Sequence, residues 1–267
     1  MYHQIKVEEK RPCVLVYNDI VYANRKSRWG RDYHPLKLHI QIPMYFHREN
    51  KPTPLLVWLE GGGWRNVSPA MRIAELGYFA LHGIAVASVE YSVDADNVWP
   101  VQLDDVKEAI AYLKAHHEEF MIDPDRIAVA GESAGGHLAA MAALTSNDLK
   151  AAVCYYTPGD FPNMPESADI FKLEDLLVGK EIRSDEKLMK EVDPREYVTK
   201  DAPPFMFLHG DADTMVSPSS SKALYDLLEE NGVEAEYYLL EGAMHCDTLF
   251  TQEAIQDLVL EFLRKHV

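Results

Sequence analysis

The chain has 267 residues, enough for one α/β domain with a large buried core, and its 47% apolar and 26% charged residues are typical of a globular protein. Its 43 acidic residues outnumber the 26 basic ones and give a formal net charge of −17. This charge argues against polyanionic partners, so we expect no binding to nucleic acid and no adhesion to an anionic membrane.

Short apolar runs typical of β-strands alternate with helical stretches along most of the chain. The opening is different, because the strands Cys13–Ala23 and Leu36–Pro43 follow each other with no helix between them. We expect these two strands to pair antiparallel at one edge of the sheet. Six more strands are predicted, at Pro54–Leu59, Ile84–Glu90, Arg126–Ala130, Leu149–Tyr156, Pro204–Leu208 and Ala235–Leu240.

Helices are predicted between these strands, in part from an apolar spacing near 3.6 residues. They cover Met71–His82, Pro100–Phe120, Gly135–Thr145, Ser217–Asn231 and Thr251–Val267. Strands that alternate with helices in this way indicate an α/β fold, with a mostly parallel eight-stranded sheet and helices on both of its faces.

The alternation lapses between Tyr156 and Ala202, where the sequence is charged and contains several prolines. Two short amphipathic pieces, Ile170–Leu177 and Asp185–Val192, lie within this insertion. A plain surface insertion would have the same pattern, but long insertions in compact domains usually carry function, so we favour a lid over the site. No linker or repeat interrupts the chain, and residues 1–267 are predicted to form a single domain.

The motif Gly131-Glu132-Ser133-Ala134-Gly135 stands directly after a predicted strand and before a predicted helix. In a strand–turn–helix context, G-x-S-x-G places a nucleophilic serine on a tight, strained turn whose neighbours must be small. The positive end of the following helix then points at the site. A simple glycine-rich turn would also fit the five letters, but the context favours Ser133 as a nucleophile.

A glycine loop, Gly61-Gly62-Gly63-Trp64, follows the strand Pro54–Leu59. Glycines let backbone N–H groups approach a developing oxyanion closely, so Gly62 and Gly63, together with Ala134, are candidates for an oxyanion hole. A phosphate-binding loop is a poor alternative, because neither the Walker lysine nor the dinucleotide pattern of glycines is present.

A serine nucleophile needs a base and an orienting acid, which follow in the order Ser, Asp or Glu, His in this type of fold. His245 lies after the strand Ala235–Leu240, at a carboxyl end where ligands bind in open α/β sheets. Asp211 and Asp213 both follow the strand Pro204–Leu208 and are both candidates for the acid. His209 is expected to anchor the acid loop, whereas packing is expected for His137 and surface positions for His116 and His117.

These motifs together resemble the esterase branch of the α/β hydrolases related to hormone-sensitive lipase, and most of all bacterial feruloyl and acetylxylan esterase-type members. The resemblance runs from about Leu36 to the C-terminus. It is carried by the glycine loop, Trp99-Pro100 through Asp105, Asp123-Pro124-Asp125-Arg126, Gly131 through Ala139, His209-Gly210 with Asp213, and His245.

The resemblance implies a serine carboxylesterase with the triad Ser133, Asp213 and His245, and with oxyanion donors from Gly62, Gly63 and Ala134. No cofactor and no metal are implied. The implied substrate is a small-molecule or oligosaccharide ester, with acetyl or feruloyl groups on plant carbohydrate as candidates. Because the chain lacks an extended apolar cap, we expect a preference for short acyl groups, acetyl to butyryl.

Two aromatic residues, Trp64 and Phe161, are candidates for lining the substrate pocket, although plain packing is an equal alternative for both. One residue departs from the family pattern, because Glu60 stands where the family usually has His before the glycines. A carboxylate beside an oxyanion hole would oppose the charge that forms there, so we expect its charge to be turned away and compensated. Arg65, Arg72 or nearby backbone N–H groups are the candidates for that compensation.

Three other functions are compatible with parts of the pattern: an arylformamidase or small peptidase on the same scaffold, a ligand receptor that has lost catalysis, and a structural role. The presence of all three triad residues argues against the receptor, and a structural role would leave the glycine loop and the strained serine turn without a purpose. A homo-oligomer is compatible with the sequence.

The first eleven residues lack the pattern of a signal peptide, and no apolar run approaches a membrane span. The three cysteines are odd in number and far apart, so a disulfide framework is not expected. These features predict a cytoplasmic protein.

Overall fold

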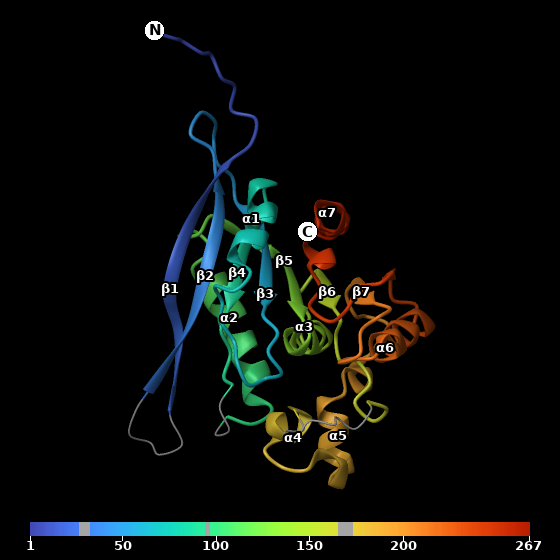
Figure 1. Cartoon of the computed structure of the whole chain (residues 1–267). Helices are drawn as coiled ribbons and strands as arrows, with labels where there is room; N and C mark the ends of the chain where they lie inside the picture. The colour runs from blue at the N-terminus through green and yellow to red at the C-terminus, as the bar shows by residue number, and fades with distance from the viewer. Residues whose placement is uncertain (27–32, 94–96, 165–172) are drawn as a thin grey trace.

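The computed structural model describes residues 1–26, 33–93, 97–164 and 173–267. Eight strands form one sheet in the order β1-β2-β4-β3-β5-β6-β7-β8 (Figure 1). The strands are β1 (Cys13–Lys26), β2 (Tyr33–Met44), β3 (Thr53–Leu59), β4 (Ala85–Val89), β5 (Ile122–Glu132), β6 (Ala151–Tyr155), β7 (Phe205–Gly210) and β8 (Ala235–Leu240). This sheet confirms the predicted α/β-hydrolase architecture.

The first two strands form the expected antiparallel pair at the edge of the sheet. β2 also pairs antiparallel with β4, and every later pair of neighbours is parallel. The central strands β4 and β6 are buried over their full length, in line with their mostly apolar sequences, whereas much of β1 is exposed.

Helices cover both faces of the sheet (Figure 1). α1 (Ile73–Leu81) and α7 (Glu253–His266) pack on one face, and α2 (Val101–Ala115), α3 (Ala134–Leu144) and α6 (Pro218–Glu230) pack on the other. α2 is shorter than predicted, because the chain turns at residues 116–121, where Met121 has a left-handed φ of 49°, and enters β5 already at Ile122.

The insertion contains two short helices, α4 (Leu173–Val178) and α5 (Glu186–Val192), beside the carboxyl ends of the central strands (Figure 1). The predicted piece Asp185–Val192 corresponds to α5. The predicted piece Ile170–Leu177 begins outside the described residues and continues into α4. The insertion therefore lies at the edge of the sheet where β5 delivers Ser133.

Candidate active site

Ser133 occupies a sharp turn between β5 and α3. Its backbone has φ 53° and ψ −119°, a left-handed region that is costly for a residue with a side chain. The turn also needs glycines on both sides: a Cβ on Gly131 would lie 2.4 Å from the carbonyl oxygen of Gly135, and one on Gly135 would lie 2.1 Å from that of Leu59. The small residues of the motif are thus required by the close approach of α3 to β3 and β5.

The side chains of Ser133, His245 and Asp213 form a hydrogen-bonded row. His245 Nδ1–H donates to Asp213 Oδ2 over 2.7 Å, which leaves Nε2 as the acceptor for the Ser133 hydroxyl at 3.0 Å. Asp213 follows β7 and His245 follows β8, so three parallel strands deliver the three side chains to one edge of the sheet. The arrangement is that of a nucleophile, a base and an orienting acid.

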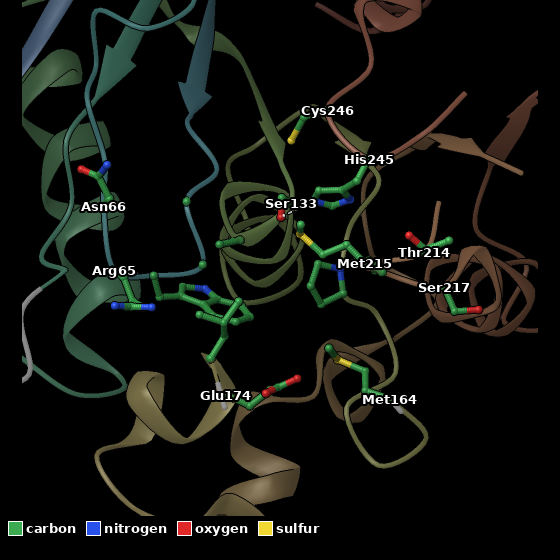
Figure 2. Close-up of a pocket in the computed structure, with 17 residues that line it drawn as sticks. Arg65, Asn66, Ser133, Met164, Glu174, Thr214, Met215, Ser217, His245 and Cys246 are labelled. Atoms are coloured by element: carbon green, nitrogen blue, oxygen red, sulfur yellow. Dashed lines mark hydrogen bonds between the residues drawn. The ribbon is translucent and has the colours of Figure 1, made fainter. Parts of the chain in front are cut away.

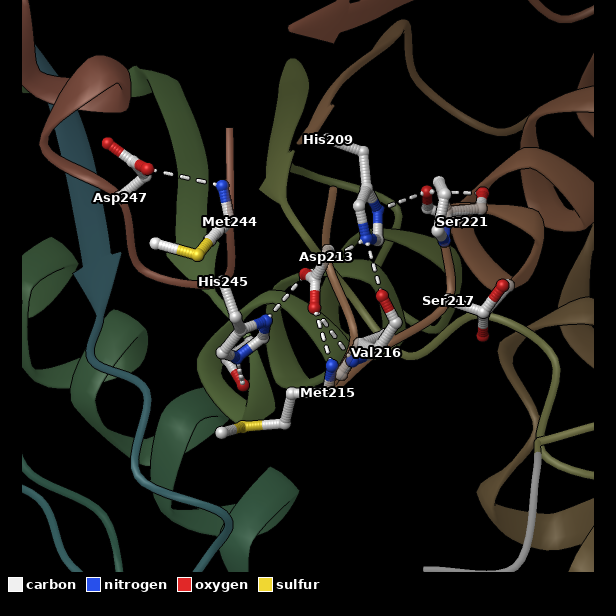
Figure 3. A network of polar contacts seen from close by, with 12 residues as sticks. His209, Asp213, Met215, Val216, Ser217, Ser221, Met244, His245 and Asp247 are labelled. Carbon is white, nitrogen blue, oxygen red and sulfur yellow. Dashed lines mark hydrogen bonds and ion pairs between the residues drawn. The ribbon is translucent and has the colours of Figure 1, made fainter. Parts of the chain in front are cut away.

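Asp213 is held by its own loop, as Figure 3 shows. Its Oδ1 accepts the backbone N–H groups of Met215 and Val216, each over 2.9 Å. His209 braces the same loop, because its Nε2 bonds to the Val216 carbonyl at 3.0 Å and its Nδ1 to Ser221 at 2.6 Å. These bonds fix the orientation of the Asp213 carboxylate independently of its bond to His245.

Asp211, the other candidate acid, is exposed and accepts the Gly242 N–H over 2.7 Å. This bond joins the acid loop to the loop that carries His245. The geometry therefore separates the two aspartates, with Asp213 facing the imidazole and Asp211 facing solvent.

Electrostatics favour a strong base at His245. Burial alone would lower the pKa of His245, but the bond to Asp213 and the adjacent Cys246 side chain raise it to about 9. Burial would likewise raise the pKa of Asp213, but hydrogen bonds from His209, His245 and the Val216 N–H hold it well below its usual range. The carboxylate therefore stays charged and stabilises a protonated imidazole.

The glycine loop closes one side of the site. Gly62 and Gly63 have φ of 128° and 61°, and a Cβ on Gly62 would lie 1.8 Å from the Asn66 carbonyl oxygen. A Cβ on Gly63 would lie 3.0 Å from the Leu173 side chain. Both glycines and Ala134 border the same cavity as Ser133, which is the arrangement expected of oxyanion donors.

The cavity above Ser133 has a volume of about 940 Å³ (Figure 2). Its walls come from the glycine loop, the acid loop, the His245 loop and the insertion. The lining residues are Gly62, Gly63, Trp64, Arg65, Asn66, Ser133, Ala134, Pro158, Met164, Leu173, Glu174, Thr214, Met215, Val216, Ser217, His245 and Cys246. A cavity of this size accepts a drug-sized ligand.

Of the two aromatic candidates, only Trp64 borders the cavity. Phe161 does not: it is 2% exposed and packs against Trp64 and His137, with ring centroids 6.0 and 4.8 Å away. The expectation for Phe161 is corrected, because the ring supports the wall from behind. His137 packs as expected, fully buried, and its Nε2 bonds to the Val192 carbonyl at 2.8 Å.

The insertion is tied to the body of the protein on two sides. Besides the bond from His137 to Val192, the Trp99 N–H donates to the Leu177 carbonyl over 2.8 Å. Leu177 and Val192 are both fully buried. Through Leu173 and Glu174, α4 forms part of the cavity wall. Movement of the insertion as a lid stays a prediction.

Glu60 faces away from the cavity. Its side chain is completely buried, and its Oε1 accepts the backbone N–H of Arg72 over 3.2 Å. The Arg72 guanidinium pairs instead with Glu132, at 3.1 Å. Burial and the neighbouring Glu132 raise the pKa of Glu60 well above its usual range. The expectation of a turned-away side chain agrees with this geometry, but the guanidinium compensates Glu132 rather than Glu60.

Several cavity residues carried no sequence signal. Thr214 to Ser217 follow Asp213 directly, so their place after β7 was the one available clue. Met164, Leu173 and Glu174 belong to the insertion, where no periodicity marks a wall. Cys246 adjoins His245 in sequence, yet a cysteine beside a histidine is not specific to any site.

Within the four described ranges, no group of three or more His, Cys, Asp or Glu side chains is arranged to hold a metal ion. No helix of the described residues is long and apolar enough to cross a membrane.

Comparisons with known proteins show the family and the fold. Residues 38–228 match the BD-FAE family. Among solved structures, a truncated form of a carbohydrate esterase from gut microbiota is 25% identical, with a TM-score of 0.82 over 94% of this chain and 95% of that one. The propionate-bound esterase Est2 of Thermogutta terrifontis shares the fold, with 24% identity and a TM-score of 0.75 over 97% of this chain and 96% of that one.

Among curated relatives, Esterase LipC of Mycobacterium tuberculosis (strain ATCC 25618 / H37Rv) is 33% identical over 214 residues, which cover 73% of this chain and 53% of that protein. The chain thus spans about half the length of the curated relatives that it matches. Since the family match covers more than half of the chain, the protein belongs to the BD-FAE family and has the α/β-hydrolase fold.

Proposed function

We propose that the protein is a serine carboxylesterase that hydrolyses short-chain acyl esters through an acyl-enzyme. The observation that carries this proposal is the row Ser133–His245–Asp213 at the base of a 940 Å³ cavity, with the serine held at a left-handed φ. A strained serine with a base at 3.0 Å and a buried acid behind it has no structural use that would balance its cost.

The reaction follows from the positions of the hydrogen bonds. Ser133 Oγ attacks the ester carbonyl while His245 Nε2 takes its proton, and Asp213 stabilises the imidazolium. The carbonyl oxygen becomes an oxyanion within reach of the backbone N–H groups of the glycine loop and of Ala134. His245 then returns the proton to the leaving alcohol, and water releases the acid from Ser133 by the same steps.

For the substrate, we propose acetyl or feruloyl groups on plant carbohydrate. The likeness to a carbohydrate esterase over nearly the whole of both chains supports the carbohydrate. The cavity supports a bulky alcohol, because polar side chains (Asn66, Thr214, Ser217) and apolar ones (Met164, Leu173) share its wall.

The test is a substrate panel: p-nitrophenyl esters of rising chain length, acetylated xylan and methyl ferulate, with Ser133→Ala as the matched control. We expect hydrolysis to peak between acetyl and butyryl, and to fall by about 10⁴-fold or more in the variant. Activity of Ser133→Ala near that of the wild type would refute the nucleophile. A peak at decanoyl or longer would refute the short-chain preference.

We further propose a cytoplasmic location. All three cysteines, Cys13, Cys154 and Cys246, are free thiols, as suits a reducing compartment. The proposed partner is a small-molecule or oligosaccharide ester substrate, with no nucleic acid and no membrane, and a homo-oligomer is compatible with the sequence.

A further inference from the structure

Behind the reacting groups lies a row of four polar side chains, Glu60, Arg72, Glu132 and Tyr156, which we call the polar chain. The backbone N–H of Arg72 donates to Glu60 Oε1 over 3.2 Å, and the Arg72 guanidinium pairs with Glu132 Oε2 at 3.1 Å. The Tyr156 hydroxyl donates to the same Oε2 over 2.5 Å. The four residues come from the end of β3, the start of α1, the end of β5 and the end of β6.

The polar chain adjoins each part of the proposed catalytic machinery. Glu60 immediately precedes the glycine loop, and Glu132 immediately precedes Ser133. The ring of Tyr156 lies edge-on to the imidazole of His245, with centroids 4.8 Å apart and an interplanar angle of 63°. The polar chain thus connects the glycine loop, on the oxyanion side of the site, to the proposed base His245.

Tyr156 is firmly held. Its backbone is left-handed, with φ 37°, and its N–H donates to the Leu208 carbonyl over 2.7 Å. Phe250 packs against its ring at 4.7 Å, and the side chain is 2% exposed. With the hydroxyl bonded to Glu132 as well, the ring has little freedom to move.

The polar chain is expensive for the fold. Glu60 and Glu132 are 0% and 4% exposed, and the Arg72 guanidinium pairs with Glu132, whereas Glu60 is bonded by the Arg72 backbone N–H. Glu60 Oε2 and Arg72 Nε have no hydrogen-bond partner among the described residues, and the nearby Trp58 indole N–H falls short of hydrogen-bond geometry. Buried charges seldom stabilise more than well-packed apolar groups would, so their presence beside a site indicates a need for fixed geometry.

His245 needs such a support. Its bonds to Asp213 and Ser133 lie at opposite nitrogens and fix the ring along one line, but they leave it free to tilt about that line. A rigid ring against its side removes this freedom. Misplacing a base by about 1 Å is enough to cost on the order of 10²-fold in rate.

We propose that the polar chain holds Tyr156 against His245, and so keeps the imidazole aligned between Asp213 and Ser133. The inference rests on the proposed esterase function. All four members of the polar chain are positioning residues, since they act through His245, the glycine loop and the turn that carries Ser133.

The experiment compares Tyr156→Phe with Tyr155→Phe, which removes a hydroxyl from a neighbouring buried ring outside the polar chain. kcat and KM are measured on p-nitrophenyl acetate, and rates are divided by the number of active sites titrated with an organophosphate. We expect Tyr156→Phe to lower kcat about tenfold with KM within twofold, because the same base activates water in deacylation. Tyr155→Phe should keep kcat within twofold of the wild type.

A second pair of variants separates positioning from folding. Glu132→Gln retains an acceptor for the Tyr156 hydroxyl and should keep most of kcat, whereas Glu132→Leu should lose as much as Tyr156→Phe. Equal kcat per titrated site in the wild type, Tyr156→Phe and Glu132→Leu would overturn the proposal. Failure of the esterase function has a different signature, namely a wild type that hydrolyses no ester or a Ser133→Ala variant that still does.

Discussion

At the scale of single residues, the proposed mechanism makes the rate depend on the charge state of His245. The base must be neutral to accept the Ser133 proton, and although burial lowers the pKa of His245, the bond to Asp213 and the adjacent Cys246 side chain raise it from 6.5 to about 9. We therefore expect kcat/KM for p-nitrophenyl acetate to fall as pH decreases. The midpoint of this fall should lie above pH 6.5, toward the raised pKa of about 9. A pH profile checks this, and a limb at or below 6.5 would contradict it.

Glu60 gives a second residue-scale prediction. Its pKa is raised in the folded state by burial and by Glu132, so the folded protein holds the proton more tightly than the unfolded chain does. This contribution to stability is present at low pH and is lost as pH rises from about 4.5 through the folded pKa. As pH rises over this interval, the free energy of unfolding of the wild type should fall relative to that of Glu60→Gln. The fall should be about 1.4 kcal/mol for each unit by which the folded pKa exceeds the unfolded one.

Urea denaturation of both proteins at pH 5 and pH 9 measures this difference. A gap that does not grow with pH would mean that Glu60 stays charged in the folded state. At neutral pH we expect kcat/KM of Glu60→Gln within about threefold of the wild type, because the side chain faces away from the oxyanion and Gln keeps the acceptor for the Arg72 N–H.

Residues with a chemical signature were predictable, and residues with only a packing role were not. Ser133 and His245 stand in patterns that backbone geometry and strand order require. Strand order alone left Asp211 and Asp213 both open, because both follow β7 and only the loop conformation decides which one faces the imidazole; the family resemblance is what selected Asp213. The sequence around Tyr156 carries no pattern that marks its proposed role, since that role depends on a contact with His245, which lies 89 residues further along the sequence.

At the scale of elements, the site depends on the close packing of α3 over β3. A Cβ on Gly135 would lie 2.1 and 2.5 Å from the carbonyl oxygens of Leu59 and Glu60, which are backbone atoms and cannot move aside. We expect Gly135→Ala to lower the free energy of unfolding by more than about 3 kcal/mol. Urea denaturation of the variant and the wild type measures this change in the free energy of unfolding.

Gly77→Ala in α1 is the matched control. The nearest atom to its added Cβ is the side-chain Oε1 of Gln41, at 3.2 Å, and alanine favours a helix over glycine. This variant should stay within about 1 kcal/mol of the wild type. A similar small change in Gly135→Ala would show that α3 can shift away from β3.

The periodicity of apolar residues predicted which segments form helices and strands, but it did not predict where each of them ends. The buried strands were recognisable as short apolar runs, and β8 has the predicted bounds. The end of α2 was placed five residues too late, because the helical spacing continues to Phe120 while the backbone already turns. Tertiary pairing of Ile122 with Thr53 draws the chain into β5 early, and no local pattern reveals that pairing.

At the scale of the whole molecule, parallel strands bring the separate motifs together. The ends of β3, β5, β7 and β8 supply the glycine loop, Ser133, Asp213 and His245 to one edge of the sheet. Topology of this kind is predictable from the alternation of strands and helices. The shape of the cavity is not, because the insertion supplies part of its wall without a regular pattern.

The net charge of −17 leads to a prediction about substrates as a class. At about 0.01 M salt the screening length is about 30 Å, so the whole negative field reaches a substrate near the cavity, whereas at 0.1 M it falls to about 10 Å. We expect kcat/KM for an anionic ester, p-nitrophenyl hemisuccinate, to rise about threefold or more between these conditions. The neutral p-nitrophenyl acetate should change little, which controls for effects of salt on the fold, and a cationic ester such as acetylcholine should show the opposite trend. Equal salt dependence of all three substrates would mean that the net charge does not act on the substrate, and a fall in rate for the anionic ester would mean that a local positive charge at the cavity, such as that of Arg65, outweighs the field of the whole protein.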